Sequence, residues 1–204
     1  KDADPRKGTQ ETVEMKLRVI GSYSDTAPWK CPKTKLILKN ALKVIVESKD
    51  MGRLGATALA LLATGEKEHL ALVREYLHNQ KWASPELKIS VEIGGKQSWS
   101  SGFHNLLLTE YFLVSGDEYV LPAIREYAIK TAMGQSGGGT WGHGFAWTSQ
   151  NEGKLHGGLP GYGALNQAGL PCYLSLLLSR KCGVEHSEVD DAISRSSRFF
   201  QQFI

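Results

Sequence analysis

The sequence predicts an all-α domain of repeated helical hairpins that form a partial α/α toroid, preceded by a short N-terminal β-strand remnant. Three observations support this fold class. Apolar residues recur with helical spacing from Thr34 onward, one sequence motif recurs after 51 residues, and glycines follow the apolar segments where helices should end. The 204 residues are enough for one domain with a sizeable core.

The first 33 residues are interpreted as a tail, a strand and a linker. Hydrophobic residues from Val13 to Val19 alternate with charged ones, which is the period-two pattern of a half-buried strand. The segment from Gly21 to Pro32 reads as a linker-like loop. Because a single strand is not stable alone, the partners of this one must come from elsewhere. Residues 34–204 are then the helical domain.

An internal repeat defines the helical unit. The segments 65–76 and 116–127 share a glycine, a leucine, a β-branched residue and a final Arg-Glu-Tyr in register. Each copy follows an apolar helix that should be buried, whereas the repeated segment itself is amphipathic and should lie outside. The expected inner helices are Leu54–Ala63, Phe103–Val114 and Leu170–Leu178. An irregular helical bundle is the alternative fold.

Two long connections place the candidate site at one end of the hairpins. The connections at 81–101 and 134–163 are far longer than the usual four to six residues, and long loops on a rigid scaffold often carry function. If inner and outer helices alternate, both loops meet at the end opposite the glycine turns. The second loop is rich in Gly, Trp and His.

The candidate site residues come from this end. His143 and His156 are the candidate catalytic acid and base, because the pKa of histidine lies near neutrality. The candidate ligand-binding residues are His104, Trp141, Trp147, Tyr162 and Asn166. Tryptophan and tyrosine offer an apolar face with a polar edge, which suits a binding rim. The alternative is a glycine-rich connector pinned by buried aromatic side chains.

Several function classes receive no support from the sequence. The net charge of +3 is scattered along the chain, so nucleic-acid binding has no electrostatic basis, and no apolar run reaches the roughly 18 residues of a membrane span. Cys31, Cys172 and Cys182 are expected to be unpaired, although one disulfide would be possible. No standard zinc, phosphate-loop or nucleophile-elbow motif occurs, so neither a metal nor a cofactor is expected. Zinc binding by His143, His156 and a cysteine is the alternative, although their spacing matches no standard site.

Two resemblances extend this interpretation. The segment 123–128, followed by Gln135, Gly139 and Trp141, resembles the Gln-Trp repeat of the isoprenoid-cyclase superfamily, which implies an α/α toroid with a ligand cavity at one end. The motifs Trp141-Gly-His-Gly and 159–172 resemble those of an uncharacterised bacterial family that joins a PDZ module to a helical domain. That resemblance implies an exported, periplasmic or secreted protein whose strand at 13–19 ends a truncated PDZ module.

The function expected from the sequence is therefore binding or processing of a small ligand, such as a carbohydrate or peptide, at the loop end. A non-catalytic structural or protein-interaction module is the alternative, with the PDZ module and further toroid repeats as partners within the protein. Whether the domain is an enzyme stays open at this point.

Overall fold

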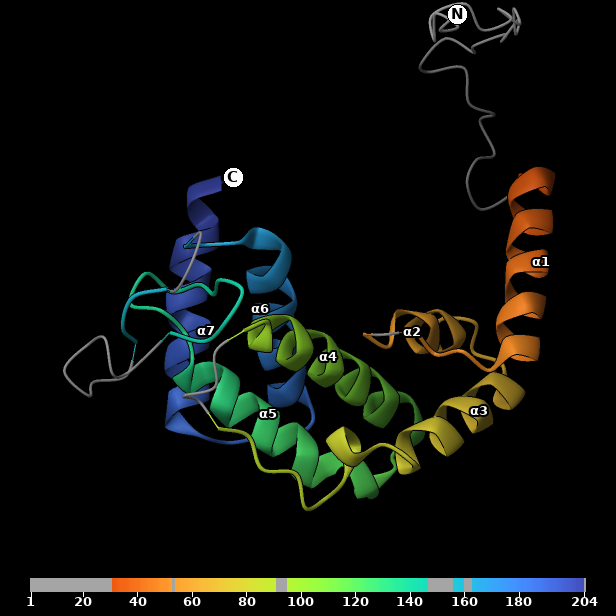
Figure 1. Cartoon of the computed structure of the whole chain (residues 1–204), viewed down its shortest axis with the longest axis horizontal. Helices are drawn as coiled ribbons and strands as arrows, with labels where there is room; N and C mark the ends of the chain where they lie inside the picture. The colour runs from red at the N-terminus through yellow and green to blue at the C-terminus, as the bar shows by residue number, and fades with distance from the viewer. Residues whose placement is uncertain (1–30, 53, 91–94, 147–155, 160–162, 204) are drawn as a thin grey trace, which may run out of the picture. The chain divides into compact units, whose positions relative to one another are not determined.

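The chain divides into two compact units, residues 1–43 and 44–204. The computed structural model describes residues 31–52, 54–90, 95–146, 156–159 and 163–203. These residues form seven α-helices and short 3-10 helices, and contain no β-strand (Figure 1). The all-α prediction is confirmed, while the strand predicted at 13–19 lies outside the described residues.

The helices follow one another without any intervening sheet. Among the described helices, none is both long and apolar enough to cross a membrane. The elements are α1 (Pro32–Ser48), α2 (Ala56–Leu62), α3 (Lys67–His78), η1 (Lys81–Ala83), α4 (Gln97–Ser115), η2 (Glu118–Val120), α5 (Leu121–Met133), α6 (Asn166–Lys181), α7 (Ser187–Phe200) and η4 (Gln201–Phe203).

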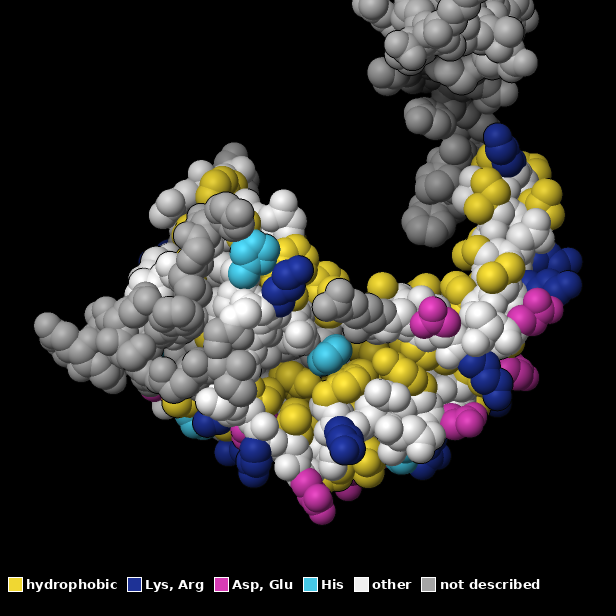
Figure 2. Space-filling view, in the orientation of Figure 1, with side chains coloured by type: hydrophobic (Ala, Val, Ile, Leu, Met, Phe, Trp, Pro, Cys, Tyr) yellow, Lys and Arg dark blue, Asp and Glu magenta, His cyan; other side chains and the backbone are white. Residues whose placement is uncertain are grey.

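In the second unit, α2, α4 and α6 form one layer of parallel helices. The Cys172 thiol, early in α6, donates to the carbonyl of Ser98 near the start of α4, and the Asn105 amide donates to Ser179 near the end of α6. Both helices therefore run in the same direction. Residues of α2, its C-cap and α4 line one shared cavity, namely Leu59, Leu62, Ala63, Leu106, Glu110 and Val114. Figure 2 shows hydrophobic side chains gathered on part of the face that it draws.

The outer positions are taken by α3, α5 and α7, each of which packs against the helix that precedes it. Leu61 and Leu108 on the inner helices are almost completely buried, whereas the Arg74 side chain is 64% exposed and Arg125 is exposed. The predicted inner and outer assignment holds for these residues, although Leu113 and Val114 at the end of α4, which were expected to be buried, are 41% and 56% exposed. Burial of the apolar face is what holds such helices in place.

The prediction is only partly right for the third inner helix. The leucines of α6 expected to be buried include Leu170 and Leu174, which are 45% and 41% exposed. The buried face of α6 instead carries mostly small residues, namely Ala168, Gly169, Cys172, Ser175, Leu176 and Ser179. Small side chains face α4 because the two backbones approach closely there: a Cβ atom added to Gly102 would lie 3.0 Å from the backbone nitrogen of Cys172.

The first long connection is shorter than predicted. Helix α4 begins at Gln97, six residues before Phe103, and the 3-10 helix η1 forms at Lys81–Ala83. The Trp99 amide donates to the carbonyl of Lys96, and the Ser98 amide donates to the carbonyl of His143. These bonds satisfy amide groups of the first turn, so the helix extends further toward its N-terminus than hydrophobic periodicity indicated.

The three cysteines are free, as expected. Cys172 is buried, and burial raises the pKa of its thiol. A neutral, buried thiol at the contact between α4 and α6 acts as a small hydrophobic residue.

The glycine turns adopt the expected conformation. Gly65 and Gly116 have φ angles of 70° and 68°, in the left-handed region. The Gly116 amide donates to the carbonyl of Phe112 and closes α4, and Asp117 then caps η2 by accepting from the amide of Tyr119. The repeated glycine therefore ends one helix while the residue after it starts the next.

The glycine turn makes a testable prediction. No atom lies within 4 Å of a Cβ added at Gly116, so Gly116→Ala introduces backbone strain without a clash and should cost about 1 kcal/mol of unfolding free energy. Gly158→Ala is the matched control, because that position is equally open and has no positive φ. Urea unfolding measures both, and equal stability of the two variants would contradict the assigned turn.

Candidate ligand-binding site

A cavity of about 400 Å³ lies beside the N-terminal half of α4. Its aromatic wall is a chain of rings from three elements. The Trp82 indole of η1 stacks on the His104 imidazole of α4 with ring centres 4.0 Å apart, and the Tyr127 ring of α5 meets His104 edge-on at 6.1 Å. Because each ring packs against the next, the wall is held rigidly.

His104 is neutral in this wall. Burial lowers its pKa from the ordinary value of 6.5 to about 4. Its Nδ1 lies 3.2 Å from the hydroxyl of Tyr127, whose own pKa is raised by burial. The Nε2 atom has no hydrogen-bond partner within the described part of the chain. The neutral ring therefore has a nitrogen available to a ligand, but it is a weak base at neutral pH.

A second cavity of about 210 Å³ adjoins the first, since Lys96 and Ser100 line both. It is also lined by Leu54, Trp99 and His143. We call the two cavities together the α4 groove. The sequence placed His104 and His143 at the same end of the hairpins, and the structure brings them to neighbouring parts of this groove.

The second long connection, at 134–163, which we call the glycine-rich loop, is anchored to α4 through His143. Its carbonyl accepts from the Ser98 amide at 3.2 Å, and its Nδ1 accepts from the Trp99 indole at 2.9 Å. The bond to Nδ1 fixes the neutral tautomer that carries the proton on Nε2. His143 is therefore oriented by two consecutive residues of α4, within a half-buried position that lines the cavity.

The charged side chain that lines the described part of the groove is positive, and one carboxylate lies close by. Lys96 is exposed and lines both cavities, and no Asp or Glu belongs to the described residues that line them. Glu126, next to Tyr127 in the chain, accepts the Ile89 amide at 2.8 Å. The Gln97 side chain donates to the carbonyl of Ser90, while its Oε1 is buried and lacks a partner among the described residues.

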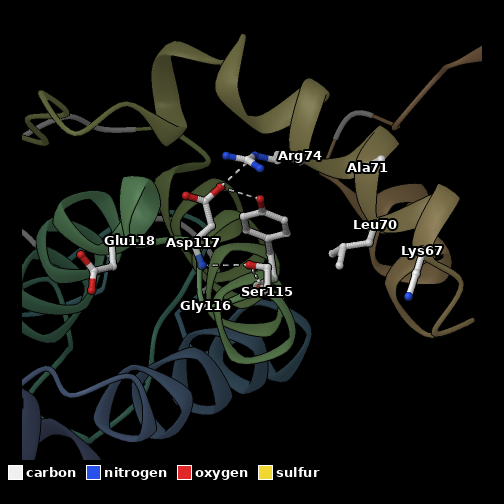
Figure 3. A pocket seen from close by; sticks show the side chains of 9 residues that line it. Lys67, Leu70, Ala71, Arg74, Ser115, Gly116, Asp117 and Glu118 are labelled. Atoms are coloured by element: carbon white, nitrogen blue, oxygen red, sulfur yellow. Dashed lines mark hydrogen bonds and ion pairs between the residues drawn. The ribbon is translucent and has the colours of Figure 1, made fainter.

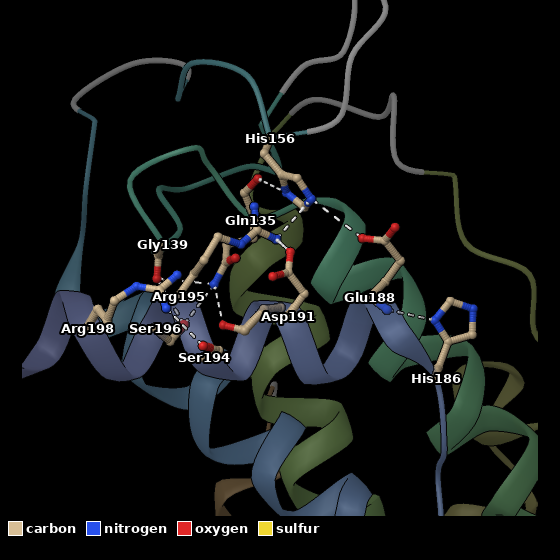
Figure 4. A network of polar contacts seen from close by, with 11 residues as sticks. Gln135, Gly139, His156, His186, Glu188, Asp191, Ser194, Arg195, Ser196 and Arg198 are labelled. Atoms are coloured by element: carbon tan, nitrogen blue, oxygen red, sulfur yellow. Dashed lines mark hydrogen bonds and ion pairs between the residues drawn. The ribbon is translucent and has the colours of Figure 1, made fainter.

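His156 belongs to a separate polar network (Figure 4). Its Nδ1 donates to the carbonyl of Gln135 at 3.0 Å, and its Nε2 lies 2.9 Å from the guanidinium of Arg195 on α7. Glu188 and Asp191 complete the group, with oxygens near enough to His156 to resemble a metal-binding set. Arg195 also pairs with Asp191 at 3.3 Å, so its positive charge offsets one of the two carboxylates.

This network ties the glycine-rich loop to α7. The buried amide of Gln135 donates to the carbonyls of Gly139 and Ala192 and to the hydroxyl of Ser196. His156 also has a φ of 64°, a conformation that residues other than glycine rarely adopt. Both ring nitrogens of His156 have partners in this network, so the geometry assigns this residue to holding the loop.

The other predicted residues have different positions. Trp141 is completely buried, and its indole donates to the carbonyl of Thr131 at 2.8 Å. The prediction that Trp141 forms part of an exposed rim is therefore wrong, because its ring packs in the core beneath the loop. Asn166 is the exposed first residue of α6. Trp147 and Tyr162 lie outside the described residues.

A third cavity, of about 490 Å³, lies at the glycine-turn end (Figure 3). Its main carboxylate, Asp117, accepts from Tyr111 at 2.7 Å and from His78 at 2.8 Å, and Arg74 lies 3.4 Å away. Burial raises the pKa of Asp117, but the hydrogen bonds from Tyr111 and His78 outweigh it, so the net pKa is lowered. The pKa of Tyr111 is raised to about 12 by burial and by Asp117. This fully paired cluster joins α3 to the turn after α4.

The sequence interpretation missed several residues of the α4 groove, namely Trp82, Lys96, Gln97, Trp99, Ser100 and Tyr127. Trp82 and Lys96 lie in the first long connection, which was predicted to face the site, but no motif there distinguishes them from other residues of the connection. Tyr127 carries a clearer signal, because it closes the repeated Arg-Glu-Tyr motif. Its counterpart Tyr76 meets the same Trp82 ring edge-on at 6.1 Å, so the repeat places a tyrosine on either side of the aromatic wall.

Comparison with protein families identifies the chain. The family model described as a domain of unknown function (DUF6288) matches residues 34–204. The chain belongs to the DUF6288 family. No curated protein matches the chain, and no solved structure does so either. Membership of DUF6288 carries no activity with it, so the function must be argued from the groove itself.

The pKa of His104 makes a testable prediction for stability. The pKa is lower in the folded state, about 4, than its ordinary 6.5, so the unfolded chain binds more protons between these values. His104 therefore stabilises the fold fully above pH 6.5, and this contribution, on the order of 3 kcal/mol, is lost as pH falls toward 4. Between pH 6.5 and 4, the free energy of unfolding measured in urea should fall less for the His104→Phe variant than for the original chain. Equal losses would contradict the assignment.

The burial of Trp141 makes a second prediction. Trp141→Phe removes the indole donor, leaves the Thr131 carbonyl unsatisfied and opens a small cavity, so it should cost about 2 kcal/mol. Trp82→Phe is the matched control, because Trp82 is only half-buried and forms no indole hydrogen bond with any described residue. Thermal unfolding should show a clearly larger loss for Trp141→Phe. A smaller loss than in the control would argue for the exposed rim position.

Proposed function

We propose that this domain binds a carbohydrate in the α4 groove. The observation that carries this proposal is the rigid aromatic wall of Trp82, His104 and Tyr127 beside an open cavity that also contains polar groups. Small-ligand sites are typically concave and largely apolar, with a few placed polar groups. Sugars match such a site because they present C–H faces to aromatic rings and hydroxyl groups to polar side chains.

The polar groups of the groove support the same ligand class. Gln97 lines the same cavity as the aromatic wall, and the neutral Nε2 of His104 offers a hydrogen-bonding position. A polyhydroxylated ligand can pair with this nitrogen, whereas a purely apolar ligand would leave it without a partner.

Binding is better supported than proton transfer. A general acid or base works best when its pKa lies near the working pH, and the pKa of His104 is about 4. The ring of His143 is already oriented by the Trp99 indole, and His156 is held by Arg195 and Gln135. Catalysis by His143 stays the second candidate, since this ring lines a cavity.

The toroid fold of the domain and the kind of protein to which it belongs are also proposals. Three parallel inner helices with outer partners support a partial α/α toroid, whose loop end holds the groove. We propose that the domain belongs to an exported bacterial protein with a PDZ module, on the basis of the motifs around Trp141 and at 159–172. Neither proposal changes the chemistry of the α4 groove.

An array of immobilised oligosaccharides, neutral, uronate-bearing and sulfated, tests the proposed function. At least one class should bind the domain, and Trp82→Ala should weaken that binding about tenfold, as aromatic contact residues commonly do. Gln97→Leu should also weaken it, whereas Phe203→Ala, an exposed aromatic on η4, should not. Circular dichroism checks that each variant is folded. The proposal would be ruled out if no class of oligosaccharide bound, or if Trp82→Ala and Gln97→Leu both bound as tightly as the original chain.

A further inference from the structure

We propose that the carbohydrate bound in the α4 groove is anionic and that Lys96 recognises its acidic group. This inference rests on the proposed function and specifies its ligand class. The acidic group is a carboxylate, as in a uronic acid, or a sulfate ester, since both present oxygens with a negative charge to an ammonium group.

The charge distribution of the groove is the first argument. Lys96 is exposed and lines both cavities. It forms no ion pair within the described residues, and none of the described lining residues is acidic. Lys96 is therefore the charged side chain of the described groove lining, and no carboxylate in that lining competes with an anionic ligand for it.

The position of Lys96 at the start of α4 is the second argument. Lys96 is the N-cap residue of a helix of 19 residues, and no side-chain hydrogen bond caps that end. The N-terminal end of a helix carries a partial positive charge, which favours anions within the first turn. The field of α4 and the charge of Lys96 thus act in the same direction at the groove.

The groups beside Lys96 show that the ligand is not a simple anion. An inorganic anion such as sulfate or chloride has no C–H face for the Trp82 ring and, when fully ionised, no hydrogen-bond donor for the neutral Nε2 of His104, which lines the same cavity. Trp99 and Trp82 line the two cavities on either side of the shared Lys96 and Ser100. A ligand that satisfies all of these groups has hydroxyl donors, C–H faces and an acidic group, which is the composition of an acidic sugar.

The test compares matched ligands that differ in charge alone. Galacturonate, glucuronate and mannuronate oligomers are titrated into the full chain beside their carboxyl-reduced neutral counterparts, and a sulfated galactose oligomer forms a third arm. At least one acidic ligand should bind about tenfold more tightly than its neutral counterpart, the difference expected of one charge-assisted hydrogen bond. The difference should shrink as NaCl is added, because Lys96 is exposed to screening.

Two lysine variants identify the residue responsible. Lys96→Gln should remove the preference for the acidic ligand while retaining its binding to the neutral sugar. Lys88→Gln removes the same charge from an exposed lysine that lines neither cavity, and it should keep the preference. If both variants reduced the preference for the acidic over the neutral ligand by the same factor, the effect would be one of general charge, and the role of Lys96 would be overturned.

The remaining outcomes separate this inference from the proposed function. Equal binding of acidic and neutral sugars, with loss in Trp82→Ala but not in Lys96→Gln, would overturn the anionic ligand and leave carbohydrate binding standing. A preference for the sulfated oligomer alone, sensitive to Lys96→Gln, supports the inference and identifies the acidic group as a sulfate ester. No binding in any arm overturns both proposals.

Discussion

The close packing of α4 against α6 is the contact on which the rest of the second unit depends. The two helices approach so nearly at Gly102 and Cys172 that only small side chains fit between them. Asn105 and Ser179 then add a buried hydrogen bond further along the same contact. Protein interiors are packed to crystal-like density, so any larger side chain at Gly102 would separate the helices. Because α4 also contacts α2 and α5, its position sets theirs.

The groove takes its shape from this fixed helix. The glycine-rich loop is bound to the first turn of α4, because the Ser98 amide and the Trp99 indole both donate hydrogen bonds to His143. One turn further along, His104 supports Trp82 from η1 and Tyr127 from α5. Three separate segments of chain, the glycine-rich loop, η1 and α5, therefore meet at the groove through contacts with one helix. A site assembled in this way has its side chains in place before a ligand arrives, which reduces the entropy lost on binding.

Much of the fold could be predicted because the relevant signals are local. The repeated glycine requires a left-handed turn, and the position of Gly65 and Gly116 follows from that requirement alone. Inner and outer helices differ in how much of their surface is apolar. The sequence shows this difference directly, since the segment around Leu61 is apolar and the segment around Arg74 is amphipathic. Helix α6 was harder, because leucines and small residues alternate around it and only the approach of α4 determines that Cys172, not Leu174, is buried.

The site was less predictable, because its members are selected by contacts between distant segments. His104 and His143 were placed at the correct end from loop length, but nothing in the sequence distinguishes them from His156. The assignment of His156 depends on Arg195, 39 residues away, and that of Trp141 on the carbonyl of Thr131. Nothing in the sequence marks Lys96 as a site residue. It differs from other exposed lysines only in lining the two cavities, and the cavities are visible only in the structure.

The attachment of the glycine-rich loop to α7 affects the order in which the molecule is assembled. Gln135 and Ser196 are 61 positions apart, and the loop cannot form these bonds until α7 has docked. Contacts between such distant positions are slow to form, because a long chain must first be closed. His143 belongs to the same loop and lines one of the two cavities. Completion of this part of the groove is therefore coupled to the docking of α7, whereas the aromatic wall of Trp82, His104 and Tyr127 contains no residue of the loop.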